Sequence, residues 1–264
     1  MRSSESAFVH TGVLLALCVS MVLTLLLSST RVREHFLITF APSPGRAYTY
    51  GEQHLDAGDM YIYDLKEAEL FLKEALRLDP HIPFAHHQLA RVDFLRGNFY
   101  SALWQINREL EINSSPSPSS YYVRGLIEGY MGRYEDSAKD YEHFLQFAPN
   151  NWAGLNDYAW VLLKAGRNSE AVAVTERGLT YFPDNPWLLN SSAIALYETG
   201  NVQKARVRAE RAITASAKLS EQEWLTAYPG NNPKVAQEGI ATLRKSAQDN
   251  MHMIEQAIAS SAVQ

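Results

Sequence analysis

A spacing of 34 or 35 residues constrains the fold of this chain more than any other feature. Glycines recur with this spacing at Gly97, Gly132, Gly166 and Gly200. Small residues keep the same phase, seven residues before each glycine and again five residues after it: Ala90, Gly125, Ala159 and Ala193, then Ala102, Ser137, Ala171 and Ala205. A period of this length is typical of stacked helical repeats, in which each unit covers the apolar face of the next.

Each period predicts a pair of antiparallel helices. A small residue in the middle of the first helix lets a partner helix approach closely, and the glycine then ends that helix in a left-handed conformation without a steric clash. Pro80, Pro149 and Pro183 stop the second helix, since proline cannot continue it. Residues 48–219 are therefore predicted to form five helix pairs, in the units 49–82, 83–116, 118–151, 152–185 and 186–219.

These residues resemble the tetratricopeptide repeat family. The third unit, for example, carries Gly125, Gly132, Tyr134, Tyr141 and Pro149 of the family pattern. The first unit has Asp56 where a small residue is expected, and the second has Ser114 in the proline position. The resemblance implies an all-α fold, an α-solenoid of stacked antiparallel helix pairs that form a right-handed superhelix. It also implies a protein-binding scaffold, because the family is defined by its fold and not by a reaction.

A long apolar segment precedes the repeats. Residues 7–28 are 22 positions without a charged side chain, which is long enough for a helix to cross a bilayer. We therefore expect a tail over 1–6 and a single transmembrane helix over 7–29 that binds the chain to the lipid bilayer. A cleaved signal peptide is the alternative, although its apolar region is usually shorter. Arg31 and Arg33 favour the cytoplasmic side for the repeats by a small margin, which leaves the side of the membrane open.

Residues 30–47 are expected to be a juxtamembrane linker. Its segment 36–40 reads Phe-Leu-Ile-Thr-Phe and is expected at the membrane–water interface, because aromatic side chains favour that boundary. Pro42 and Pro44 then break any helix that approaches the repeats.

The segment 220–264 is predicted to form capping helices. Ser220 and Glu223 have the spacing of a capping box at a helix start. Apolar residues then recur at steps of three and four, as expected of one face of a long helix: Ala236, Ile240, Leu243, Ala247, Met251, Ile254 and Ile258. A cap on the last repeat is the preferred interpretation. The alternative is that this apolar stripe binds a partner or a second copy of the chain.

The sequence contains no recognisable catalytic or metal-binding motif. A net charge of −5 argues against general nucleic-acid binding, and a single cysteine, Cys18, excludes a disulfide framework. No glycine-rich phosphate loop, nucleophile elbow or zinc-protease motif occurs. His81, His86 and His87 cluster without companion ligands at a suitable spacing. We therefore expect no enzymatic activity, no catalytic residue, no cofactor and no metal.

What remains is a binding surface. In proteins of this family the first helices line a concave groove, and the resemblance projects the following residues into it: Phe84, His87, Arg91, Phe94, Tyr122, Leu126, Tyr130, Asn156, Trp160, Lys164, Trp187, Asn190 and Tyr197. About half of these are expected to pack between neighbouring pairs. The aromatic character favours an apolar or aromatic partner segment. The predicted function is thus a membrane-anchored scaffold for a protein or peptide partner; the alternative is a structural subunit of a membrane or envelope assembly that uses the C-terminal helix as its interface.

Overall fold

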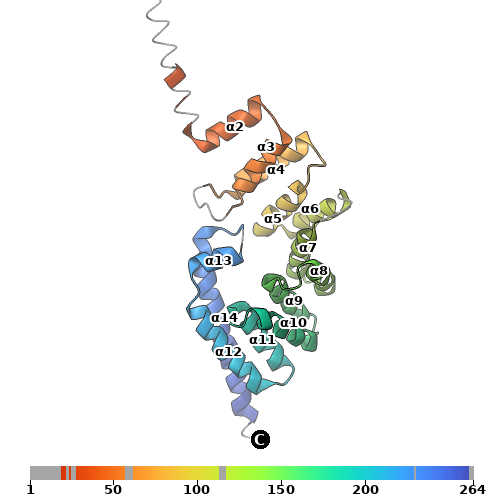
Figure 1. Ribbon diagram of the computed structural model, residues 1–264, viewed down its shortest axis with the longest axis vertical. Coiled ribbons are helices and arrows are strands. Elements are labelled where there is room, and N and C mark those ends of the chain that lie inside the picture. Colours follow the sequence, from red (N-terminus) through yellow and green to blue (C-terminus); the bar gives the residue numbers. More distant parts are fainter. Residues whose placement is uncertain are drawn as a thin grey trace, which may run out of the picture.

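The computed structural model describes residues 19–21, 24, 28–56, 62–112, 117–228 and 230–261. Every regular element in these ranges is helical (Figure 1). The predicted all-α class is therefore confirmed for this part of the chain.

Ten of the helices form five pairs that follow one another in a curved row (Figure 1). The two helices of each pair pack against each other, and the second helix of each of the first four pairs packs against the first helix of the next pair. The pairs are α3 (Pro44–Gln53) with α4 (Leu65–Leu78), α5 (Ala85–Leu95) with α6 (Phe99–Ile112), α7 (Pro118–Tyr130) with α8 (Tyr134–Phe147), α9 (Trp152–Lys164) with α10 (Asn168–Tyr181), and α11 (Pro186–Glu198) with α12 (Val202–Ala217). This arrangement is a solenoid, because the contacts run along the row and not around one shared centre.

The periodic glycines end the first helices as predicted. Gly97, Gly132, Gly166 and Gly200 have φ angles of 77°, 78°, 75° and 79°. In this left-handed region a side chain with a Cβ atom would be strained, so glycine is the residue that allows the sharp turn into the second helix.

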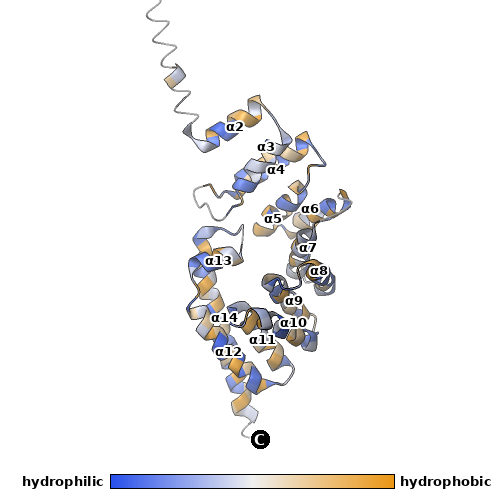
Figure 2. Ribbon diagram, in the orientation of Figure 1, coloured by the Kyte–Doolittle hydropathy of each residue, from blue (hydrophilic) through white to orange (hydrophobic). Residues whose placement is uncertain are grey.

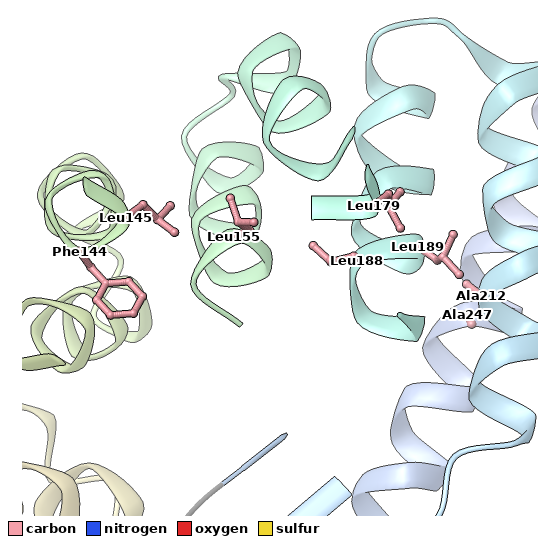
Figure 3. Close-up of a cluster of buried hydrophobic side chains, with 8 residues drawn as sticks. All are labelled: Phe144, Leu145, Leu155, Leu179, Leu188, Leu189, Ala212 and Ala247. Atoms are coloured by element: carbon pink, nitrogen blue, oxygen red, sulfur yellow. The ribbon is translucent and has the colours of Figure 1, made fainter. Parts of the chain in front are cut away.

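The core lies between successive pairs. Figure 3 shows one cluster that passes through the last three of them, from α8 through α9, α10 and α11 to α12, and on to Ala247 of α14. Leu155 and Leu188 in this cluster are fully buried. The small residues of the period let the helices approach closely: a Cβ atom on Gly125 of α7 would lie 3.3 Å from the Tyr141 ring on α8. The periodic pattern therefore specifies helix proximity as well as helix ends.

The C-terminal segment forms α13 (Glu221–Ala227), a short 3₁₀ helix η1 (Pro233–Val235) and the long α14 (Ala236–Ser261). The predicted capping box at Ser220 is present, with Glu223 bonded back to the Ser220 backbone. The apolar stripe of α14 packs against α11 and α12, and Ala247 and Ile254 are fully buried there. Figure 2 shows apolar and polar residues alternating along α12 and α14, as expected of helices with one buried face.

The region before the first pair differs from its prediction. Residues 30–47, expected to be a linker, contain α2 (Thr30–Phe40) and the first residues of α3. Pro44 is the first residue of α3, where its missing N–H has no helical partner to lose. Most of the transmembrane helix predicted over 7–29 lies outside the described residues. Among the helices of the described ranges, none combines the length and the apolar composition that crossing a bilayer requires.

Candidate functional site

The projected groove residues lie on the first helices of four successive pairs. Phe84 is the exception, because it precedes α5 and has a left-handed φ of 65°. These first helices, α5, α7, α9 and α11, also contact one another along the row. The structure nevertheless divides the projected residues into four groups with different surroundings.

The first group is a continuous row of aromatic rings. The Phe94 and Tyr130 ring centroids are 5.1 Å apart at an interplanar angle of 87°, and those of Tyr130 and Trp160 are 5.5 Å apart. Phe99 lies 5.8 Å from Tyr130, and Tyr134 lies 6.5 Å from Trp160. We call these five residues, which come from α5 to α9, the aromatic row. Tyr130 at its centre is 57% exposed, so the row is open to a ligand.

Phe99 and Tyr134 were not among the residues projected into the groove. Both stand two residues after a periodic glycine, where the repeat pattern places an aromatic side chain. That position signals packing at the start of the second helix, and only the three-dimensional contacts show that the rings also extend the row. The row further depends on a small residue, since a Cβ atom on Gly129 would lie 2.8 Å from the Trp160 ring.

The second group centres on a polar pair beside the aromatic row. The Tyr122 hydroxyl donates a hydrogen bond of 2.6 Å to Asp157 Oδ2, and the Asn156 amide donates one of 3.2 Å to Asp157 Oδ1. Burial raises the pKa of the Asp157 carboxyl to about 6, although both hydrogen bonds favour its charged form. The Tyr122 ring also packs against Tyr141 and Phe144 on α8. Tyr122 therefore serves helix packing as well as the groove, and Leu126, one turn further along α7, is partly buried too.

The raised pKa of Asp157 predicts a pH dependence of stability. An ordinary value of 3.8 applies in the unfolded chain, so the folded protein binds this proton more readily between that pH and about 6. Folding stability should therefore increase as the pH falls from 7 to 5, by at most about 1.4 kcal/mol per pH unit from this group. Urea unfolding of the wild type and of Asp157→Asn at both pH values checks this. On going from pH 7 to pH 5, the free energy of unfolding of the wild type should rise relative to that of Asp157→Asn. An equal difference between the two proteins at both pH values would contradict the assignment.

The third group is covered by the C-terminal helices. Trp187 is buried, stacked on Trp152 at 5.0 Å and met edge-on by Tyr228 at 5.9 Å. Asn190 accepts a hydrogen bond of 2.8 Å from the Asn250 amide and donates one of 3.2 Å to Ser246 Oγ, both on α14. Tyr197 packs against a buried cluster of α11, α12 and α14. At this end of the row, the projected groove residues are therefore mainly packing residues.

The opposite end holds buried polar side chains. His87 Nδ1 lies 3.0 Å from Ser120 Oγ, and burial lowers the pKa of His87 to about 4, so that the ring is neutral near pH 7. The Phe84 ring meets the His87 ring edge-on at 6.1 Å. Arg91 donates a hydrogen bond of 2.8 Å to Gln88 Oε1, and burial lowers its pKa. Lys164, in contrast, is exposed at the end of α9.

The loop between α13 and α14 connects the two ends of the solenoid. The Tyr63 hydroxyl, just before α4, donates a hydrogen bond of 2.7 Å to the Gly230 carbonyl. Gly230 has a φ of 88°, and a Cβ atom there would lie 2.5 Å from Nη2 of Arg91. Figure 1 shows α13 and its loop beside the first two helix pairs. The C-terminal segment therefore reaches across the concave side to the first two helix pairs.

A polar cleft lies where this C-terminal segment meets α4. It has a volume of about 720 Å³ and is lined by Tyr63, Asp64, Leu65, Lys66, Glu69, Arg96, Asn232, Pro233 and Lys234. Lysine, arginine and carboxylate groups alternate along its wall, so it has no uniform charge. Within the described ranges, no group of three or more histidine, cysteine or acidic side chains could hold a metal ion.

Comparisons with known proteins agree with the fold. A tetratricopeptide repeat sequence model matches residues 122–186 and 159–232. The structure is similar to that of YrrB, described as a tetratricopeptide repeat protein with an unusual peptide-binding site, at 13% identity and a TM-score of 0.58, over 70% of this chain and 92% of that one. A structure of MamA is similar at 15% identity and a TM-score of 0.55, over 66% of this chain and 94% of that one. A second MamA structure, from AMB-1, gives 16% identity and a TM-score of 0.54, over 71% and 100%.

No curated protein matched the sequence. The solved structures share too little sequence to indicate more than the fold. The predicted tetratricopeptide-like solenoid is thereby confirmed.

Proposed function

We propose that this protein is a non-enzymatic scaffold that binds an apolar or aromatic peptide segment of a partner protein on the aromatic row. The observation that carries the proposal is the arrangement of the row itself. Five aromatic side chains from three helix pairs touch in sequence, and the central Tyr130 stays 57% exposed. A row of contacting aromatic rings that is exposed at its centre is typical of an interaction site.

The row is suited to binding because its rings already support one another. An aromatic side chain has few rotatable bonds, so a ligand loses little free energy in ordering it. The edge-on contact of Phe94 with Tyr130 restricts those rings further. Aromatic residues also dominate the binding energy of many protein interfaces. YrrB, which has a similar fold, is described as having a peptide-binding site, and this is consistent with the proposal.

The remaining projected residues have smaller roles in this proposal. Trp187, Asn190 and Tyr197 are engaged by the C-terminal segment, so they are not proposed as primary contacts. Lys164 lies four residues after Trp160 on α9 and is exposed, and it would meet a carboxylate or carbonyl group on the bound segment.

We also propose that residues 7–29 anchor the chain in a lipid bilayer, as a single-pass protein with the repeats on the cytoplasmic side. The 22 uncharged positions and the flanking Arg31 and Arg33 support this. A protease added to sealed inside-out membrane vesicles should digest the repeats. Protection of the repeats from the protease would show that the chain has the opposite orientation.

The alternative function, assembly through the C-terminal helix, is less well supported. The apolar stripe of α14 packs on α11 and α12 of the same chain, so most of it is not exposed to a second protein or a second copy. An interface there would first have to separate α14 from the last helix pair.

The peptide-binding proposal predicts a specific loss of affinity. Peptides selected by the full chain from a random display library should be rich in aromatic and aliphatic residues. Replacing Tyr130 and Trp160 together with alanine should weaken their binding at least tenfold, or about 1.4 kcal/mol, because a central aromatic contact is lost. The measurement is titration calorimetry, with helicity followed by circular dichroism.

Tyr181→Ala is the matched control, since this tyrosine on α10 is 54% exposed and lies outside the aromatic row. It should leave the affinity unchanged. Tyr130→Ala alone guards against a folding defect, because Tyr130 is the most exposed ring of the row. Undiminished binding by a well-folded double variant would show that the row is not the binding site.

A further inference from the structure

Helix α2 differs from an ordinary surface helix, because its one buried side chain is charged while its largest exposed side chains are apolar. The side that packs against the first helix pair carries Glu34 together with half-buried Ile38, and the side that faces away carries exposed apolar residues. An ordinary amphipathic helix buries its apolar side. This reversal concerns a segment that the peptide-binding proposal does not use.

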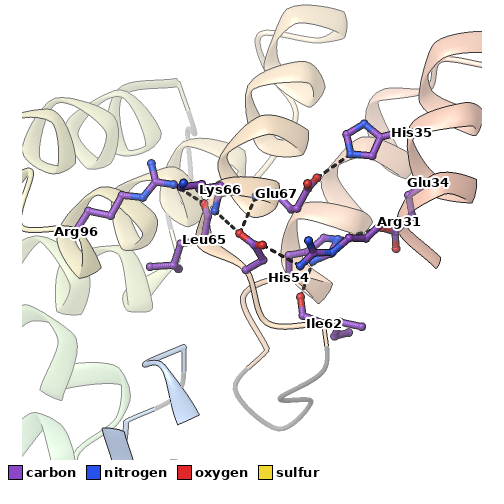
Figure 4. A network of polar contacts seen from close by, with 10 residues as sticks. Arg31, Glu34, His35, His54, Ile62, Leu65, Lys66, Glu67 and Arg96 are labelled. Atoms are coloured by element: carbon purple, nitrogen blue, oxygen red, sulfur yellow. Dashed lines mark hydrogen bonds and ion pairs between the residues drawn. The ribbon is translucent and has the colours of Figure 1, made fainter. Parts of the chain in front are cut away.

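The charged side is fixed by polar contacts to three different segments (Figure 4). Glu34 Oε2 lies 2.9 Å from His54 Nε2, and both side chains are buried. The other ring nitrogen of His54 lies 2.6 Å from the Ile62 carbonyl oxygen. The orientation of α2 is thus set by a buried contact, since removing either partner would leave the other buried group without its hydrogen bond.

Two further pairs of side chains hold the same side of α2 against the solenoid. Arg31 Nη2 lies 2.8 Å from Asp64 Oδ2, and His35 Nε2 lies 2.8 Å from Glu67 Oε2 on α4. These exposed or half-exposed pairs each contribute little stability. Together with Glu34 they nevertheless define which face of α2 points away from the solenoid.

The outward face is apolar and aromatic. Val32, Phe36 and Phe40 follow one another at steps of four residues, which places them along one side of the helix. Phe36 is 41% exposed and Phe40 is 72% exposed, and their ring centroids lie 4.6 Å apart with the ring planes tilted by 39°. Arg33 is exposed as well, one residue after Val32. Large apolar side chains that are turned outward while the charged Glu34 is buried indicate a surface that something apolar covers.

We infer that this face of α2 lies on the surface of a lipid bilayer, with Phe36 and Phe40 at the boundary between headgroups and acyl chains. The inference rests on the proposed membrane anchor. The uncharged residues 7–28 end two residues before α2, so an anchor there would bring this helix to the lipid boundary. The 11 residues of α2 span roughly 16 Å, too short to cross the hydrocarbon core but sufficient to lie along it.

The chemistry of the face fits this occupant. Phenylalanine and valine favour the acyl boundary, and the positive charge of Arg33 is attracted to lipid phosphates. The buried contacts of Glu34 keep α2 attached to the solenoid at the same time. The helix would therefore hold the repeat array at a fixed orientation to the membrane.

Spin labels in the full chain test this inference. With Cys18 replaced by serine, a label is attached at Phe36→Cys or Phe40→Cys, and the protein is reconstituted in vesicles of phosphatidylcholine and phosphatidylglycerol. Collision of the label with oxygen, which dissolves in lipid, is compared with collision with a water-soluble nickel complex. The control label is at Tyr100→Cys on α6, where the side chain is 81% exposed. Labels at 36 and 40 should collide with nickel at least about threefold less than the label at 100, and more with oxygen.

Three results would overturn the inference. In vesicle-bound protein, the nickel complex could reach the labels at 36 and 40 as readily as the label at 100. This result would place α2 in water while leaving the anchor intact. Labels shielded from both probes would show that protein covers the face. A chain that does not associate with the vesicles would refute the anchor and the inference together. In each case peptide binding by the aromatic row is measured separately, so that proposal stands or falls on its own result.

Discussion

Leu188→Ala is expected to lower the free energy of unfolding by about 3–4 kcal/mol, the cost of removing a large side chain from a tightly packed site. Leu188 is fully buried between α9, α10 and α11. The site has little freedom to collapse around the smaller residue, because a Cβ atom on Gly178 of α10 would already lie 2.9 Å from both terminal methyl groups of Leu188. Urea denaturation followed by circular dichroism measures the loss. Val207→Ala on α12, where the valine is 53% exposed, should change stability by less than about 0.5 kcal/mol.

The distribution of the effect distinguishes a solenoid from a single core. Because each pair contacts mainly its neighbours, the Leu188 cavity should weaken the contact of the last pair with the rest of the row. Amide hydrogen exchange should then accelerate more in α11 to α14 than in α5 to α8. A uniform acceleration along the chain would contradict nearest-neighbour coupling.

Gly239→Ala is expected to destabilise the C-terminal cap, although the same change usually stabilises a helix by up to about 1 kcal/mol. Gly239 lies in the first turn of α14, against the indole ring of Trp224 on α13. A Cβ atom there would lie 2.3 Å from the ring, so Trp224 would have to leave its buried position. Overpacking of this kind costs about 1–3 kcal/mol. A shift of the thermal midpoint and of the tryptophan fluorescence would report the loss.

Gly45→Ala is the matched control for the sign of this effect. Gly45 also lies in the first turn of a helix, α3, and outside its own helix turn and chain neighbours nothing lies within 4 Å of the position that its Cβ would occupy. This variant should be as stable as the wild type or slightly more stable. If Gly239→Ala were also stabilising, Trp224 would not be packed as the structure shows.

The repeat fold was predictable from the sequence because its signals are local. The periodic glycines, such as Gly97 and Gly132, predict a left-handed φ angle at their own positions, and each of them has one in the structure. The capping box at Ser220 is local in the same sense, since both of its hydrogen bonds join residues three apart. Small residues at a constant period then fix how closely neighbouring helices approach.

The surroundings of the groove were not predictable, because they depend on residues far apart in the chain. Asn190 was projected into the groove, but its partners Ser246 and Asn250 are 56 and 60 residues away. Trp187 is covered by Tyr228 of the segment that returns across the concave side. A repeat pattern describes only the relation between one unit and the next, so it contains no information about that returning segment.

The orientation of α2 was hidden for a similar reason. Phe36, Leu37, Ile38 and Phe40 appear in the sequence as one apolar stretch, which gives no sign of which residues face the protein. The contact of Glu34 with His54 and that of Arg31 with Asp64 settle the orientation, and they link residues 20 and 33 positions apart. The prolines at 42 and 44 suggested a break but not the helix that precedes it.

A photo-reactive phenylalanine derivative introduced at position 130 tests the central claim, peptide binding on the aromatic row, most directly. The same group at position 181 is the control, because Tyr130 and Tyr181 are almost equally exposed. Upon irradiation with a peptide selected by the wild-type chain, we expect a covalent adduct at 130 and none at 181, with the adduct at 130 lost when Trp160 is replaced by alanine. An adduct at 181, or none at 130 while the peptide is still bound, would contradict the account.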